Sequence, residues 1–125
     1  MKNIFTLASL VFVSMQAISA EKAIYLSCPY FDSRAPDLIV VLDQSNGLAS
    51  LQSPSMGSGL NFTAAASFGP DKVTWRKDSK SLKQIYSVDR SSLIFERKTY
   101  SEMTSDVHSD KSECNLVKKP ESAKF

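Results

Sequence analysis

The sequence contains little histidine, cysteine, tryptophan or glycine. Its 125 residues include one histidine, two cysteines, one tryptophan and four glycines. No Gly-x-Ser-x-Gly elbow occurs, and no two acidic residues are placed to form a buried carboxylate pair. Gly57 and Gly59 lack the strand-to-helix context and the lysine of a phosphate-binding loop. We therefore predict that the protein is not an enzyme and that it holds no cofactor.

Clustered metal ligands are also scarce. The cysteines have no Cys-x-x-Cys spacing, and His108 is distant from both of them in the sequence. Asp106, His108 and Asp110 offer oxygen and imidazole ligands within the polar segment from Tyr100 to Glu113. That segment lacks the glycine and the ligand spacing of a calcium loop and has no apolar period. We predict a solvated loop there and no metal site.

No strong charge of either sign is present. The chain has 15 Lys and Arg and 13 Asp and Glu, and one of the basic residues, Lys2, lies in the first twenty residues. The remaining 105 residues are therefore nearly neutral. A nucleic-acid-binding domain would carry a basic stripe, so no nucleic-acid partner is predicted.

A single long apolar stretch occurs, at the beginning of the chain. Lys2 precedes the apolar residues from Ile4 to Met15, and small residues follow up to Ala20. This order is typical of a secretory signal peptide, and the run is shorter than the roughly 20 residues of a membrane-spanning helix. We predict a signal peptide over residues 1–20, with cleavage after Ala20 or, alternatively, after Ser19. No second such stretch follows, which predicts an exported chain without a membrane span, located in a bacterial periplasm or outside the cell.

Residues 21–125 have the length of one domain. Cys28 and Cys114 bracket nearly all of it. An even number of cysteines in an exported chain predicts a disulfide. By the chain-entropy relation, closing so long a loop stabilises the fold by about 4–5 kcal/mol at most.

Short runs of alternating apolar and polar residues, separated by polar turns, predict β-strands. The stretch from Val73 to Lys98 contains three such runs, joined by turns at 78–81 and 89–92. Asn46-Gly47 predicts another hairpin, because both residues tolerate a positive φ. In all, eight strands are expected, near residues 23–28, 37–43, 48–52, 61–68, 73–77, 82–88, 93–98 and 114–118.

Seven or eight short strands without a convincing helix predict an all-β antiparallel meander. Closure into a small barrel would remove exposed strand edges, and a disulfide between the first and last strands fits closure. A two-sheet sandwich is the alternative. Residues 21–125 are predicted to form this single domain, with 119–125 as a disordered tail.

Several short motifs resemble the periplasmic and membrane-bound inhibitors of C-type lysozyme. They are Tyr25-x-x-Cys28, Ser58-Gly59-Leu60-Asn61-Phe62, Trp75-Arg76-Lys77 and Cys114. Members of that family are small exported β-barrels with a disulfide between their first and last parts. The resemblance implies that Ser58, Gly59 and Lys77 form a partner-binding site, in which Ser58 and Lys77 reach the catalytic carboxylates of a lysozyme. Phe62 stands where the family has tyrosine, and Asp78 where it has glycine.

These observations predict a small exported binding module without catalytic activity, whose partner is a protein or a small apolar ligand. One alternative is a lysozyme inhibitor. Another is a carrier, because a small barrel holds one apolar ligand when its interior is not filled. Five aromatic residues are candidates for the lining of such a cavity: Phe62, Phe68, Trp75, Tyr86 and Phe95.

Overall fold

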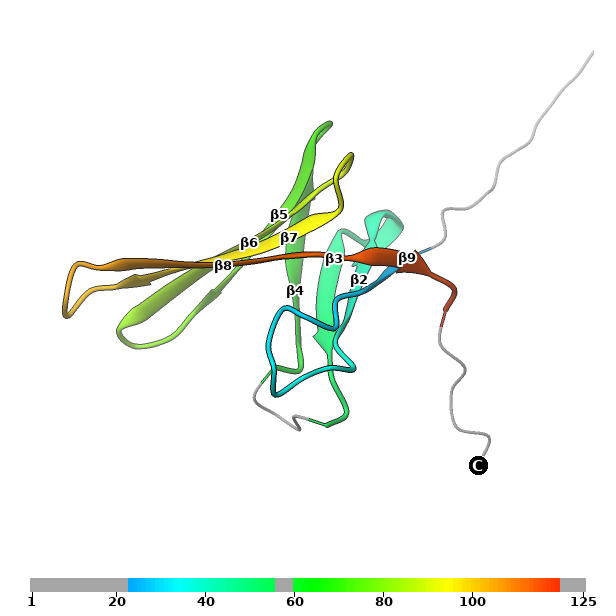
Figure 1. Ribbon diagram of the computed structural model, residues 1–125. Helices are drawn as coiled ribbons and strands as arrows, with labels where there is room; N and C mark the ends of the chain where they lie inside the picture. Colours follow the sequence, from blue (N-terminus) through cyan, green and yellow to red (C-terminus); the bar gives the residue numbers. More distant parts are fainter. Residues whose placement is uncertain (1–22, 56–59, 120–125) are drawn as a thin grey trace, which may run out of the picture.

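The computed structural model describes residues 23–55 and 60–119. The chain is all-β, and every predicted strand is present (Figure 1). The predicted signal peptide and residues 120–125 of the predicted tail lie outside the described residues. The elements are β1 (Ile24–Ser27), β2 (Ile39–Asp43), the 3-10 turn η1 (Gln44–Asn46), β3 (Leu48–Gln52), β4 (Phe62–Phe68), β5 (Lys72–Asp78), β6 (Leu82–Asp89), β7 (Ile94–Ser101), β8 (Val107–Glu113) and β9 (Asn115–Val117).

The strands form a nearly closed antiparallel barrel. From β1 to β8 each strand pairs with the next one along the chain, and β9 pairs with β1. Only Cys114 separates β8 from β9, so one continuous stretch of chain contacts β7 on one side and β1 on the other. Figure 1 shows this stretch running along the whole length of the sheet. The prediction of a barrel is confirmed.

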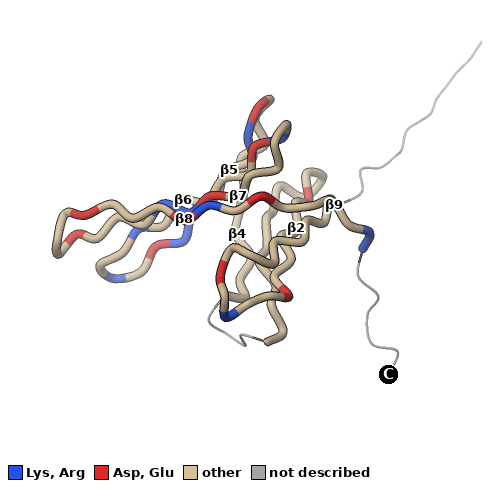
Figure 2. Tube along the Cα trace, in the orientation of Figure 1, with Lys and Arg blue, Asp and Glu red and all other residues tan. Residues whose placement is uncertain are grey.

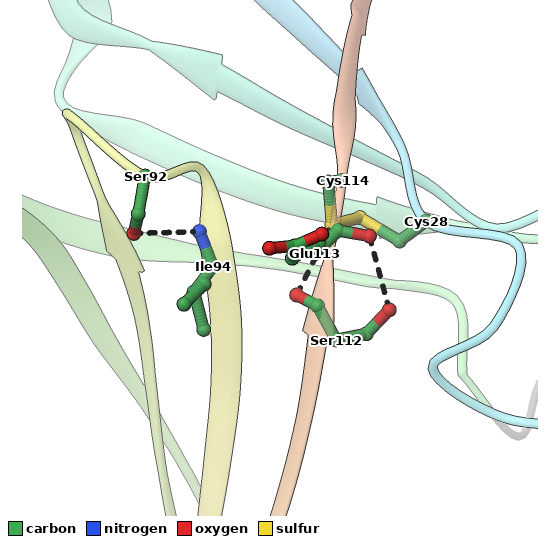
Figure 3. The surroundings of a disulfide bond; sticks show 6 residues. All are labelled: Cys28, Ser92, Ile94, Ser112, Glu113 and Cys114. Atoms are coloured by element: carbon green, nitrogen blue, oxygen red, sulfur yellow. Dashed lines mark hydrogen bonds between the residues drawn. A yellow bond between two sulfur atoms is a disulfide. The ribbon is translucent and has the colours of Figure 1, made fainter.

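The disulfide lies where the barrel closes. Cys28 follows β1 and bonds to Cys114 between β8 and β9, with the two Cα atoms 4.5 Å apart (Figure 3). Both residues are buried, with 0% and 5% of their surfaces exposed. The backbone N–H of Cys114 donates to the carbonyl of Leu93, so the closing stretch is also tied to the beginning of β7. The predicted bridge is thereby confirmed.

One part of the sequence prediction was wrong. The segment from Tyr100 to Glu113 is not a loop, because Val107–Glu113 forms β8 and pairs with β7 over seven residues. Most of β8 is exposed, so its side chains carry no apolar alternation, and its pairing depends on backbone hydrogen bonds. β7 also continues to Ser101, beyond the predicted end.

The turn between β2 and β3 differs in detail from the prediction. Gly47 has a φ of +66°, whereas Asn46 is the last residue of η1 and is not among the described residues with positive φ. Asn46 contributes differently: its Nδ2 donates to Asp43 Oδ2 at 2.8 Å. The hairpin therefore uses one left-handed residue and one carboxylate cap.

Charge is distributed unevenly over the sheet. β1 to β4 contain one charged residue, Asp43, whereas β5 to β8 carry all the other Lys, Arg, Asp and Glu of the described strands (Figure 2). Strands β6, β7 and β8 extend past the barrel on the left of Figure 1, where both of their faces are hydrated. Within the described part of the chain, no helix has the length and apolarity needed to cross a membrane.

Candidate functional site

The barrel has two different ends. The turns at 44–47, 69–71 and 90–93 lie at the upper end in Figure 1, here called the turn end, where β1 begins and β9 ends. The long connection from β1 to β2 and the chain on either side of residues 56–59 lie at the opposite end, here called the loop end. The two ends are filled to different degrees.

Aromatic side chains fill the interior toward the loop end. Trp75 and Tyr86 stack with ring centroids 5.6 Å apart, and Tyr86 and Phe95 stack at 6.0 Å. Phe31 packs on Phe95 at 4.4 Å, and Phe62 on Tyr86 at 5.4 Å. Trp75, Tyr86 and Phe95 are at most 2% exposed. Three of the five aromatic residues proposed to line a cavity are therefore part of the core, and Phe62 is partly buried against it.

The turn end is not filled. A cavity of about 320 Å³ opens there between the strands. Its buried wall consists of Leu26, Leu42, Val73 and Val88, each at most 6% exposed. Phe68 and Leu93, which are partly buried, complete the apolar wall, and Phe68 is the one member of the predicted aromatic set that lines it.

The rim of the cavity combines exposed apolar residues with two polar ones. Ile24 and Leu116 are 45% and 61% exposed, although both belong to the lining. Gln44 and Arg90 are the polar residues of the lining. These two residues extend the apolar surface of the cavity out to its opening.

The turn between β6 and β7 places two of these residues at the rim. Asp89 Oδ1 accepts hydrogen bonds from the backbone N–H groups of Ser92 and Ser91, both at 2.9 Å. These two bonds hold the pKa of Asp89 below its usual value. The turn then brings Leu93 into the left-handed region, with a φ of +61°. For a residue with a Cβ this conformation costs about 1–2 kcal/mol.

Arg90 belongs to the same turn. Its backbone N–H donates to the carbonyl of Asp71 at 2.9 Å, which ties the turn to the neighbouring turn between β4 and β5. Its side chain is exposed, and among the described residues it forms no hydrogen bond or ion pair. A guanidinium group with five donors is thus available beside an apolar opening.

Of the residues suggested by the lysozyme-inhibitor resemblance, only Lys77 can be placed. It lies on β5, half-buried, with its Nζ 4.7 Å from the centroid of the Phe62 ring. Among the described residues, no carboxylate lies within ion-pair distance of this ammonium group. Ser58 and Gly59 lie outside the described residues. Cys28 and Cys114, the other predicted residues, form the disulfide.

The remaining polar clusters have structural explanations. Ser53 is fully buried and donates from Oγ to Asp37 Oδ1 at 2.6 Å, while its backbone N–H donates to Asn61 Oδ1 at 2.8 Å. These bonds join the two connections at the loop end, and the Ser53 hydroxyl lowers the pKa of Asp37. His108 lies 3.3 Å from Asp110 on β8 and is 75% exposed. No group of three or more His, Cys, Asp or Glu able to hold a metal occurs among residues 23–55 and 60–119.

The sequence analysis did not identify the aliphatic lining of the cavity. Leu26, Leu42 and Leu116 appear in the sequence as ordinary inward residues of strands. One indication was available: the run from Asp37 to Asp43 is continuously apolar at the strand that precedes the Asn-Gly turn. The cavity itself depends on how nine strands meet, which local periodicity does not describe.

Comparison with known proteins adds no family to this description. No protein-family model, curated protein or solved structure matches the chain.

Proposed function

We propose that this protein is an exported, non-enzymatic binding protein that takes one small apolar molecule into the cavity at the turn end of its barrel. The observation that carries the proposal is the contrast between the two ends. Three stacked aromatic residues close the interior toward the loop end, while a space of about 320 Å³ with an apolar wall remains open at the other. Ligand pockets in proteins begin at about this volume.

The strained turn residue supports the same function. Leu93 holds a φ of +61°, a conformation that glycine or asparagine adopts with less strain. A large apolar side chain at this position is costly for the fold, yet it extends the apolar wall of the cavity. Strain of this kind collects at binding sites, where it is offset by the rest of the structure.

Calorimetric titration of the full exported chain with octan-1-ol tests the proposal. Binding with a negative heat-capacity change is expected, because apolar surface is removed from water. Val73→Phe, whose larger side chain would occupy the cavity, should weaken binding at least tenfold. Val41→Phe is the matched control, because Val41 does not line the cavity. Absence of binding by the unaltered protein would reject the proposal.

Export is the second part of the proposal, and the bridge between Cys28 and Cys114 supports it, since disulfides persist mainly in oxidising compartments. Intact mass of protein recovered from the producing cells, with and without reduction, provides the test. A chain that begins at Glu21, with both thiols blocked until reduction, is expected. An uncleaved chain with two free thiols would contradict it.

Inhibition of a C-type lysozyme is the second candidate function. The observation that favours it is Lys77, whose ammonium lies over Phe62 without a carboxylate partner among the described residues. A fixed cation of this kind would complement a pair of carboxylates in a catalytic cleft. The candidate uses the loop end of the barrel and is therefore independent of the cavity at the turn end.

A lysozyme activity assay with increasing amounts of the mature protein distinguishes this candidate. Loss of turnover that Lys77→Gln abolishes would support it. Lys98→Gln is the matched control, because Lys98 is exposed and lies on the opposite face of the same sheet, in the row of Arg76 and Ile85. Unchanged turnover at excess protein would eliminate inhibition.

A further inference from the structure

We infer that the ligand of the cavity is an anionic amphiphile: a single short hydrocarbon chain that ends in a carboxylate or another acidic group, bound to Arg90. This inference rests on the function proposed above and names the chemical class of the ligand. It follows from the position of one unpaired cation at the opening of an apolar cavity.

Arg90 is the single charged residue among the ten that line the cavity. The other nine supply an apolar wall and one amide, that of Gln44. A ligand whose hydrocarbon part is buried therefore meets one charge, at the rim, and that charge is positive. A guanidinium group favours carboxylate and phosphate because it can donate two parallel hydrogen bonds to either.

The acidic residues near the rim are engaged elsewhere or are not in contact with Arg90. Asp89 accepts from two backbone N–H groups of its own turn. Asp43 accepts from Asn46 and from the hydroxyl of Ser45. Asp71 is exposed, and no carboxylate of the described residues lies within 4 Å of the Arg90 guanidinium. Arg90 is therefore free to bind an anion from solution.

Two backbone hydrogen bonds hold the turn that carries this cation. The N–H of Arg90 is bonded to Asp71, and Leu93 N–H to the carbonyl of Asp89, so the turn is held at both of its ends. The head group of a bound ligand would thus lie beside Arg90 while its chain lies against Leu93 and Val88. At about 30 Å³ for each water-sized group, the cavity of about 320 Å³ accommodates a chain of roughly eight to ten carbon atoms.

A charge series of ligands of one length tests the inference on the full chain. Octanoate, octyl phosphate, octan-1-ol and octylamine are titrated at low salt, and octanoate or octyl phosphate is expected to bind at least tenfold more tightly than the alcohol. Arg90→Gln should remove that preference, so that the acids and the alcohol bind with about the same affinity. Arg76→Gln is the matched control, because Arg76 lies outside the cavity and pairs with Asp78.

The outcomes separate the inference from the function on which it rests. Equal binding of the acids and the alcohol, or tighter binding of the amine, would overturn the inference and retain the apolar cavity as a binding site. Failure of all four compounds to bind would overturn both. A preference for the acids that survives in Arg90→Gln would also refute the inference, because the preference would then have another origin.

Discussion

Leu26 and Leu116 are direct partners on β1 and β9, yet Leu26 is fully buried whereas Leu116 is 61% exposed. Both line the same cavity. The wall of the barrel is therefore covered at Leu26, on β1, and ends at Leu116, on β9. The last strand therefore closes the barrel and also forms the edge of its opening.

The disulfide should contribute a large part of the stability. It closes a loop of 86 residues, for which the chain-entropy relation gives about 4–5 kcal/mol as an upper value. The double variant Cys28→Ser, Cys114→Ser is expected to lose several kcal/mol of unfolding free energy, measured by urea denaturation. Reduction of the unaltered protein should produce a similar loss. A variant as stable as the bridged protein would contradict this account of closure.

Filling the cavity should raise the stability of the fold, whereas overfilling the core should lower it. Val73 and Val40 are both buried valines on strands, but only Val73 lines the cavity. Val73→Phe is expected to raise the unfolding free energy by about 0.5–2 kcal/mol, as cavity-filling changes commonly do. Val40→Phe should lower it by about 1–3 kcal/mol through overpacking. Equal losses in the two variants would show that the turn end is packed as tightly as the core.

Lowering the pH should remove a contribution that the carboxylate of Asp32 makes to the free energy of unfolding. Arg34 donates side-chain and backbone hydrogen bonds to this carboxylate, which lowers its pKa from 3.8 to about 2. A depressed pKa means that the stabilisation is present above pH 3.8 and is lost as the pH falls toward 2. Denaturation at several pH values between 2 and 7 should show this loss. Asp32→Asn and Arg34→Gln should each weaken the pH dependence, and the double variant should weaken it no further than the larger single effect.

Two ion pairs of the same sheet should differ in strength. Arg97 donates from Nε and Nη2 to Asp110 at 3.1 and 2.8 Å, and its guanidinium lies 5.0 Å from the centroid of the Phe31 ring. The pair is partly buried, with side-chain exposures of 17% and 26%. A double-mutant cycle with Arg97→Gln and Asp110→Asn is expected to give a coupling of about 1 kcal/mol. The side chains of Arg76 and Asp78 are 58% and 50% exposed, so the same cycle on this pair should give about 0.2–0.5 kcal/mol. A larger coupling for the exposed pair would contradict this ranking.

Local patterns in the sequence were sufficient for most of the strands. Phe62, Ala64, Ala66 and Phe68 alternate with exposed residues on β4 as expected, because a strand that is covered on one face repeats every two residues. The Asn-Gly pair marked a hairpin, although only Gly47 has positive φ among the two. β8 was missed because most of its side chains are exposed, so nothing in their order distinguishes a paired edge strand from a loop.

The candidate site was less predictable than the fold. The sequence predicted Lys77 as a partner-binding residue, which stays a prediction, and the disulfide of Cys28 and Cys114, which is confirmed. It predicted neither Arg90 nor the aliphatic lining of the cavity. Arg90 follows a strand in a turn, a place where charged residues are common and usually only hydrated. Its position at the rim of the cavity becomes visible only when the turn that carries it is placed beside β1 and β9.

The sequence by itself determined the all-β class and the positions of most strands, because these depend on residues that are close together in the chain. It also determined the pairing of Cys28 with Cys114, because these are the two cysteines of the sequence. The tertiary structure alone decided which end of the barrel is filled. An inward-facing leucine fits the two-residue alternation of a strand whether or not another side chain contacts it across the interior of the barrel. Whether space remains depends on the summed volumes of side chains from many strands and on the angle at which those strands close, and here the aromatic residues occupy one end and leave the other open.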